Sequence, residues 1–135
     1  MTADKPYIIQ FDSIGDAVLG YISVAEENKN IPFIIKRTYW TYYTPQSVNR
    51  GDHANIDKEL VLIAVAGIIK VDIELQNGYK EQFVLDRPDC GLFMPRLCWH
   101  SMNYSHNAVQ LVLASNLYSD TDYIRDYNQF HSYGQ

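Results

Sequence analysis

Apolar and polar residues alternate along the middle of the chain with a period of two. The alternation is clearest from Ile68 to Leu75, and it is followed by Asn77-Gly78 and by a second short run from Glu81 to Leu85. A period of two indicates a strand with one buried face, and Asn-Gly between two such runs is typical of a type I′ hairpin turn. The pattern therefore predicts a β-hairpin over residues 68–85.

The rest of the chain shows the same pattern of short strands. The longest apolar run, Leu60 to Gly67, continues into Ile68 and Ile69 and indicates a pair of buried strands. Elsewhere short segments rich in Val, Ile, Tyr and Phe alternate with turn residues, and no repeat or linker interrupts them. Short strands at this spacing indicate an antiparallel sandwich or barrel, and we expect one domain over residues 1–135.

The C-terminal stretch breaks this pattern. From Asp120 to Phe130, aromatic or apolar side chains recur at Tyr123, Ile124 and Tyr127 and at the end of the stretch. This spacing marks one face of a helix, and Asp120 or Thr121 would supply the N-cap. The predicted architecture is therefore all-β, closed by one short C-terminal helix.

Composition and charge exclude several classes of protein. Of the 135 residues, 47% are hydrophobic and 20% are charged, which is typical of a globular domain. The 11 Lys and Arg against 16 Asp and Glu leave no basic face for a nucleic-acid backbone, so we expect no nucleic-acid partner. The longest apolar run is about half a membrane span, so we expect no membrane partner. Only Cys90 and Cys98 occur, and the N-terminus lacks a signal-peptide pattern, which predicts a reducing, cytoplasmic location.

Four histidines are the first candidates for chemistry. His53 ends a polar loop, and His100 follows Trp99 in a segment with strand character, whereas His106 and His131 lie in polar settings and are expected to be solvated. Imidazole titrates near neutral pH, so a histidine in an aromatic pocket is suited to proton transfer. The alternative is a histidine that only hydrogen-bonds a neighbour in its loop.

A metal site is a second interpretation of the same region. His53, Glu59 and His100 offer imidazole and carboxylate ligands. Asn55, however, is a poor replacement for an imidazole ligand, and the three remaining ligands make a weak site. We therefore favour proton transfer and expect no metal.

An aromatic segment supplies further candidates. If residues 37–43 form a strand, Arg37 and Tyr39 lie on one face, while Trp40 and Tyr42 lie on the other. The first face would offer an arginine for a phosphate and a tyrosine for a sugar or base. The alternative is that the aromatic rings fill a barrel core while Arg37 extends to water.

Several stretches carry a resemblance that covers nearly the whole chain in order. They are Glu26-Glu27-Asn28-Lys29-Asn30-Ile31-Pro32-Phe33, Ile35-Lys36-Arg37-Thr38-Tyr39, Arg50-Gly51 with His53-Ala54, Gly91-Leu92 with Pro95, Trp99-His100 with Met102, Leu113-Ala114-Ser115, and Asp122-Tyr123-Ile124-Arg125 with Tyr127. With these motifs the chain resembles the cupin-fold family of dTDP-4-keto-6-deoxyglucose 3,4-ketoisomerases, which make precursors of deoxyaminosugars. The Trp-His pair and the Asp-Tyr-Ile-Arg segment are its most specific motifs.

The resemblance implies a cupin jelly-roll barrel that binds a dTDP-linked 4-keto-6-deoxy sugar in its mouth, without a metal or other cofactor. It also implies a homodimer with exchanged N-terminal strands. The implied reaction moves the carbonyl from carbon 4 to carbon 3 through an enediol intermediate, which requires a base and donors to the developing oxyanion.

The resemblance also implies roles for individual residues. His53 matches the first histidine of the family's His-Ala-His motif and is expected to be catalytic, together with Tyr39. The residues expected to bind the substrate are Arg37, Arg50, Asn55, Trp99 and His100.

One departure from the family pattern is Asn55, which stands where the family has its second histidine. Asn can hydrogen-bond a hydroxyl but cannot exchange its charge state. The residue before His53, commonly aromatic in the family, is Asp52. A slower isomerase, an isomerase with a different product configuration at carbon 4, a non-catalytic dTDP-sugar binding cupin and a metal-dependent cupin enzyme are the alternatives that stay open.

Overall fold

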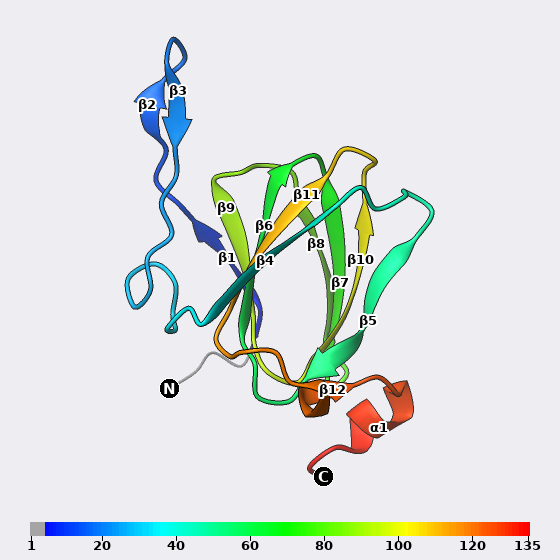
Figure 1. The fold of residues 1–135 in the computed structure, drawn as a ribbon. Coiled ribbons are helices and arrows are strands. Elements are labelled where there is room, and N and C mark those ends of the chain that lie inside the picture. Colours follow the sequence, from blue (N-terminus) through cyan, green and yellow to red (C-terminus); the bar gives the residue numbers. More distant parts are fainter. Residues whose placement is uncertain (1–4) are drawn as a thin grey trace.

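Two antiparallel five-stranded sheets face each other and form a barrel (Figure 1). The computed structural model describes residues 5–135. In spatial order the first sheet contains β1 (Tyr7–Gln10), β9 (Cys90–Met94), β6 (Leu60–Ala66), β11 (Val109–Ala114) and β4 (Arg37–Tyr42). The second contains β12 (Tyr123–Ile124), β5 (Asn49–Asn55), β10 (Cys98–Tyr104), β7 (Ile69–Leu75) and β8 (Lys80–Leu85). The expected jelly-roll barrel is thus confirmed.

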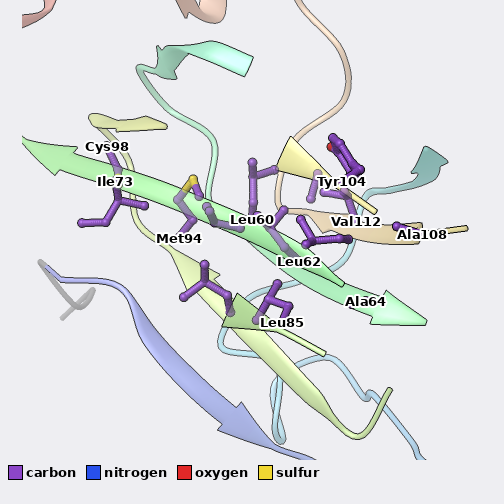
Figure 2. Close-up of a cluster of buried hydrophobic side chains, with 14 of the residues drawn as sticks. Leu60, Leu62, Ala64, Ile73, Leu85, Met94, Cys98, Tyr104, Ala108 and Val112 are labelled. Atoms are coloured by element: carbon purple, nitrogen blue, oxygen red, sulfur yellow. The ribbon is translucent and has the colours of Figure 1, made fainter. Parts of the chain in front are cut away.

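The space between the two sheets is filled by the residues that the period-two pattern points inward. On β7 the alternate residues Ile69, Val71 and Ile73 are buried, while Lys70 and Asp72 are exposed. Figure 2 shows how side chains from several strands meet in this cluster. Full burial of each aliphatic side chain contributes about 1.5–3 kcal/mol to folding, so the cluster stabilises the barrel that carries the site.

The hairpin of β7 and β8 is confirmed, but its turn is not of the predicted type. A type I′ turn needs positive φ at both Asn77 and Gly78, and only Gly78 has it, at 91°. The amide of Gly78 donates to the carbonyl of Leu75 at 3.0 Å, and the amide of Leu75 donates to the carbonyl of Tyr79 at 2.9 Å. The Asn77 side chain accepts from the amide of Tyr79 at 3.0 Å, which holds this longer loop closed.

The predicted C-terminal helix exists but begins later than expected. Its N-cap is Asp126, not Asp120 or Thr121, and α1 spans Tyr127–Ser132. The preceding residues form a 3₁₀ turn, η1 (Asp120–Asp122), and strand β12, which pairs with β5. The prediction of one helix over residues 120–130 is wrong because the backbone of β12 hydrogen-bonds to a neighbouring strand and not within a helix. Within the described chain no helix has the length and apolar character needed to cross a membrane.

A second hairpin stands away from the barrel. Strands β2 (Ile14–Asp16) and β3 (Gly20–Ile22) pair with each other and extend from the barrel at the upper left of Figure 1. Val18 and Leu19 at the hairpin tip are each 89% exposed. The two strands form a sheet of their own, with no third strand within residues 5–135. Because an isolated two-stranded hairpin is only marginally stable in water, this one needs further packing.

Candidate functional site

A pocket of about 380 Å³ lies between the two sheets and gathers polar side chains from both. Most of the residues singled out from the sequence line it, and they come from strands β4, β5 and β10, which are far apart in the chain. These residues are Arg37, Tyr39, Arg50, His53, Asn55 and His100. The fold therefore brings together all the sequence-predicted site residues except Trp99.

A β-bulge in β5 explains how Arg50 and His53 both reach the pocket. Three positions apart on a regular strand, they would lie on opposite faces. Here the pairing with β10 shifts register, and Asp52 is an extra residue with φ 57°. Gly51 has φ 96°, and a Cβ at this position would lie 2.8 Å from the carbonyl oxygen of His100. A glycine is therefore required where the bulge presses against β10.

The two candidate histidines lie next to each other in the pocket. The ring centroids of His53 and His100 are 4.6 Å apart, at an interplanar angle of 71°. Burial lowers the pKa of His53 below its ordinary value of 6.5, and the positive charges of Arg125 and Lys58 lower it further. His53 is therefore unprotonated at neutral pH, which is the state that a general base requires.

His100 is the more deeply buried of the pair, with 2% of its surface exposed. Burial lowers its pKa to about 3, and the neighbouring His53 contributes in the same direction. Its Nδ1 lies 3.0 Å from the carbonyl oxygen of Cys98, and since a carbonyl only accepts, Nδ1 carries the proton. This bond fixes the tautomer and leaves Nε2 as an acceptor.

The low pKa of His100 predicts a dependence of stability on pH. The unfolded chain binds a proton near pH 6.5, whereas the folded chain binds it only near pH 3. Between these values the unfolded state holds more protons, so the free energy of unfolding falls as the pH falls, in total by a few kcal/mol. Urea unfolding at a series of pH values measures this slope, which we expect to be shallower in His100→Gln. An unchanged slope would contradict the assignment.

Strand β4 supplies a tyrosine and an arginine on the face predicted from its alternation. Burial raises the pKa of Tyr39, so its hydroxyl keeps its proton. The guanidinium carbon of Arg37 lies 4.5 Å from the ring centre of Tyr39 and 5.1 Å from that of Tyr118. Within residues 5–135, Arg37 Nη1 is buried and has no hydrogen-bond partner. Because an unpaired buried donor is costly, this atom is suited to an anionic ligand.

Two further pocket residues, Tyr123 and Arg125, were not singled out from the sequence as site residues. The ring centroid of Tyr123 is 4.9 Å from that of His53, and the guanidinium carbon of Arg125 is 4.5 Å from the Tyr123 ring centre. The sequence pattern assigned both to a helix that does not form there. The signal that pointed to them is the Asp122-Tyr123-Ile124-Arg125 motif, which the resemblance already contained.

A buried network anchors Asn55 behind the pocket. Its Nδ2 donates to Asp122 Oδ2 at 3.3 Å, and Asp122 Oδ1 accepts from the amide of Asp57 at 2.7 Å. The ammonium of Lys58 lies 3.8 Å from Asp122 Oδ2, and the Lys58 side chain is 1% exposed. Asn55, the residue that departs from the His-Ala-His pattern, is therefore held in place by the carboxylate of Asp122.

Trp99 lies outside the pocket. It points to the other face of β10 from His100 and packs against the rings of Tyr127 and Phe130, with centroid distances of 5.4 and 5.6 Å. Its contacts therefore attach α1 to the barrel, and we leave Trp99 out of the proposed site. Glu59 also does not line the pocket, and in the described residues no three His, Cys, Asp or Glu side chains are grouped to hold a metal ion.

His131 also differs from its expected role as a solvated histidine. Its Nε2 lies 2.8 Å from Glu74 Oε2, and the side chain is 34% exposed. The hydroxyl of Tyr127 donates to the same carboxylate at 2.7 Å. Both residues belong to α1, so Glu74 on β7 is a second anchor for the helix.

A family model and a known protein both match nearly the whole chain. The model of the FdtA family, described as WxcM-like, C-terminal, matches residues 4–135. The TDP-4-oxo-6-deoxy-alpha-D-glucose-3,4-oxoisomerase of Aneurinibacillus thermoaerophilus is 41% identical over 127 residues, covering 93% of this chain and 90% of that protein.

Solved structures show the same relationship. A 3,4-ketoisomerase from Helicobacter canadensis is 37% identical, with a TM-score of 0.89 over 96% of both chains. QdtA, a sugar 3,4-ketoisomerase from Thermoanaerobacterium thermosaccharolyticum in complex with TDP, is 32% identical, with a TM-score of 0.89 over 97% of this chain and 94% of that one. The chain belongs to the FdtA family of cupin-like sugar-nucleotide ketoisomerases.

Proposed function

We propose that the protein converts a dTDP-linked 4-keto-6-deoxy hexose into its 3-keto isomer, with His53 as the proton-transfer base. The observation that carries the proposal is that His53 shares one pocket with Tyr39 and three arginines. Burial lowers the pKa of His53, which favours the free base. The substrate class follows from the oxoisomerase and ketoisomerase relatives, one of which was solved with TDP.

The reaction begins with removal of the proton on carbon 3. His53 takes this proton, the electrons form a double bond between carbons 3 and 4, and negative charge develops on the oxygen of carbon 4. Donors fixed in the pocket stabilise that charge without reorganising, which lowers the barrier. Return of a proton to carbon 4 and loss of the hydroxyl proton on carbon 3 complete the isomerisation. No net oxidation takes place, so atoms and electrons balance within the sugar.

The arginines of the pocket are suited to the diphosphate. Arg37, Arg50 and Arg125 line the same cavity, and guanidinium groups bind phosphate oxygens in pairs. Their focused positive charge holds an anion although the chain as a whole carries a net charge of -5. Of the three arginines, we assign Arg37 to the diphosphate, because its Nη1 is buried and lacks a hydrogen-bond partner in residues 5–135.

A combined activity and binding assay tests the proposal against its alternatives. We expect chelator-treated protein to convert dTDP-4-keto-6-deoxyglucose to the 3-keto isomer, followed by NMR. A non-catalytic binding module would bind dTDP in calorimetry and leave the sugar unchanged. A metal-dependent enzyme would lose turnover on chelation and regain it with a divalent transition metal. Either of these two results would contradict the proposal.

We also infer a homodimer in which the β2–β3 hairpin of one copy covers the barrel of the other. The outer face of the first sheet has an apolar groove of about 790 Å³, lined partly by Ile63, Val65 and Leu111. The hairpin presents apolar side chains to solvent, among them Val18 and Leu19. An uncovered apolar groove and an unsupported apolar hairpin on the same chain complement each other in a second copy.

Substitution of the hairpin tip tests the dimer. Light scattering of the wild type is expected to give about twice the 15.6 kDa mass of the chain. Leu19→Glu places a charge in the interface and should shift the protein to the monomer, because burying an unpaired charge is costly. Val84→Glu on β8, where Val84 is 50% exposed, is the matched control and should leave the mass unchanged. A monomeric wild type would contradict the inference.

The prediction of a reducing, cytoplasmic compartment rests on the two cysteines. Both are free thiols, and burial raises the pKa of Cys98 to about 12. Burial also raises the pKa of Cys90. Neither thiol has the thiolate character that reactive or redox-sensing cysteines show.

A further inference from the structure

A buried lysine, Lys58, lies behind the pocket. The side chain of Lys58 is 1% exposed, and lysines are almost never buried to this extent unless they are paired. Its acidic neighbour, Asp122, lies 3.8 Å away, which is too far for a hydrogen bond. The ammonium instead donates to the hydroxyl oxygen of Tyr123 at 3.4 Å. Lys58 is therefore directed at a phenol that lines the pocket.

The direction of this hydrogen bond determines where the Tyr123 proton points. An ammonium has no lone pair, so it can only donate, and the Tyr123 oxygen is the acceptor. The phenol keeps its own hydrogen for another partner, and among the side-chain bonds of residues 5–135 it donates to none. Since Tyr123 lines the pocket and its ring is 4.9 Å from His53, its hydroxyl hydrogen is available to a ligand in the pocket.

Positive charge surrounds this phenol. The Lys58 ammonium is 4.9 Å from the centre of the Tyr123 ring, and the guanidinium carbon of Arg125 is 4.5 Å from it. A fixed cation beside an oxygen stabilises negative charge that builds there while a proton is in transit. Tyr123 thus combines a free O–H, contact with the pocket and a buried cation behind its oxygen.

The reaction requires a second acid–base group for which these residues are suited. Besides the proton that moves from carbon 3 to carbon 4, a proton must move from the oxygen on carbon 3 to the oxygen on carbon 4. Asn55 cannot carry it, because an amide does not exchange its charge state in this way. On the basis of the proposed function, we propose that Tyr123 carries this oxygen proton as a catalytic residue and that Lys58 is its positioning residue.

The isomerisation then takes two steps. In the first, His53 takes the proton of carbon 3 while Tyr123 donates its proton to the oxygen of carbon 4, which gives a neutral enediol, an imidazolium and a phenolate. In the second, the phenolate takes the hydroxyl proton on carbon 3, the carbonyl forms there, and the imidazolium returns its proton to carbon 4. Both side chains end in their starting states.

Tyr123→Phe tests the proposal, because it removes the hydroxyl and keeps the ring that packs against His53. We expect kcat for isomerisation to fall by about 10²–10⁴-fold and the Kd for dTDP to change less than about threefold. Tyr118→Phe is the matched control: its hydroxyl bonds to Asp120, and its ring is 5.9 Å from that of Tyr123. The control should keep wild-type turnover.

Deuterium exchange separates a proton carrier from a structural tyrosine. Without Tyr123 the first step is slower, because the oxygen of carbon 4 receives no proton, and the second step is slower as well, because no phenolate takes the hydroxyl proton on carbon 3. Exchange at carbon 3 requires only the first step, whereas product formation requires both. In D₂O we therefore expect Tyr123→Phe to slow deuterium exchange at carbon 3 of the substrate less than it slows product formation. An equal loss of exchange and turnover, or turnover within about threefold of wild type, would overturn the proposal.

A double-mutant cycle tests the positioning role of Lys58. Lys58→Met is expected to lower kcat about tenfold with little change in KM, and to have no further effect in a Tyr123→Phe background. If Lys58→Met folds poorly, the cycle is run with Lys58→Met/Asp122→Asn, which leaves no unpaired charge. Additive losses would overturn the coupling. A wild type without isomerase activity would refute the proposed function itself, whereas an active wild type with an active Tyr123→Phe refutes only the role of Tyr123.

Discussion

His53→Asn is expected to lower kcat for ketoisomerisation by about 10³-fold or more, while the Kd for dTDP changes less than about threefold. The pocket of the described chain contains two histidines, and only His53 is placed to act as base. His100 is 2% exposed, and burial lowers its pKa to about 3, so its free Nε2 is a much weaker base. Asparagine keeps some of the polarity of the site but removes the group that takes the proton. NMR of the turnover measures kcat, and calorimetry measures the Kd for dTDP.

His106→Asn is the matched control for this variant. His106 is exposed in the loop before β11, so the same change of residue type there should leave kcat at the wild-type value. A His53→Asn protein that turns over at the wild-type rate would remove His53 from the mechanism. Loss of dTDP binding together with turnover would instead place His53 in binding.

Asp122→Ala is expected to lower the free energy of unfolding by about 3–5 kcal/mol, because it leaves the buried ammonium of Lys58 without a counter-charge. The substitution also removes the acceptor for Asn55 Nδ2 and for the amide of Asp57. Both Lys58 and Asp122 are under 10% exposed, at 1% and 7% of their side chains, so solvent screens the loss little. Urea unfolding measures the change.

Removal of both charges separates the cost of the unpaired Lys58 charge from the cost of the lost hydrogen-bond acceptors. Lys58→Met/Asp122→Asn has no unpaired charge and keeps an acceptor for the Asp57 amide, so we expect it to recover most of the lost stability. Lys29 and Glu26 form an ion pair at 3.3 Å whose side chains are 73% and 54% exposed. Glu26→Gln is the control and should cost much less than Asp122→Ala. A loss of less than about 1 kcal/mol in Asp122→Ala would contradict the buried-pair assignment.

The strand pattern of the sequence predicts the barrel well because its core alternates regularly. On β7 and β4 each inward position follows from a period of two, so the faces of Ile69 and Arg37 agree with the structure. The chemistry of a turn is less visible, since Asn77-Gly78 fits several loops and the hydrogen bonds of Leu75 decide among them. The start of α1 is hidden for the same reason: Tyr123 and Ile124 suit a helix face and an edge strand equally.

The site is predicted in part, for a reason that one bulge illustrates. Alternation alone separates Arg50 from His53, and only the extra residue, Asp52, brings both to the pocket. Trp99 does not line the pocket, because a neighbour of His100 on a strand faces away from it. Lys58 carries no local signal of its burial, since its partners Asp122 and Tyr123 are more than sixty residues away in the chain.

The measurement that tests the central claim most directly is NMR of the wild-type protein with dTDP-4-keto-6-deoxyglucose in D₂O. If His53 moves a proton between the two carbons, the carbon 3 proton of the substrate disappears and the 3-keto isomer forms with deuterium at carbon 4. Deuterium enters because the base exchanges its proton with solvent before or during return. A sugar that keeps its carbon 3 proton at every enzyme concentration, although dTDP binds, would contradict the assignment of ketoisomerase activity.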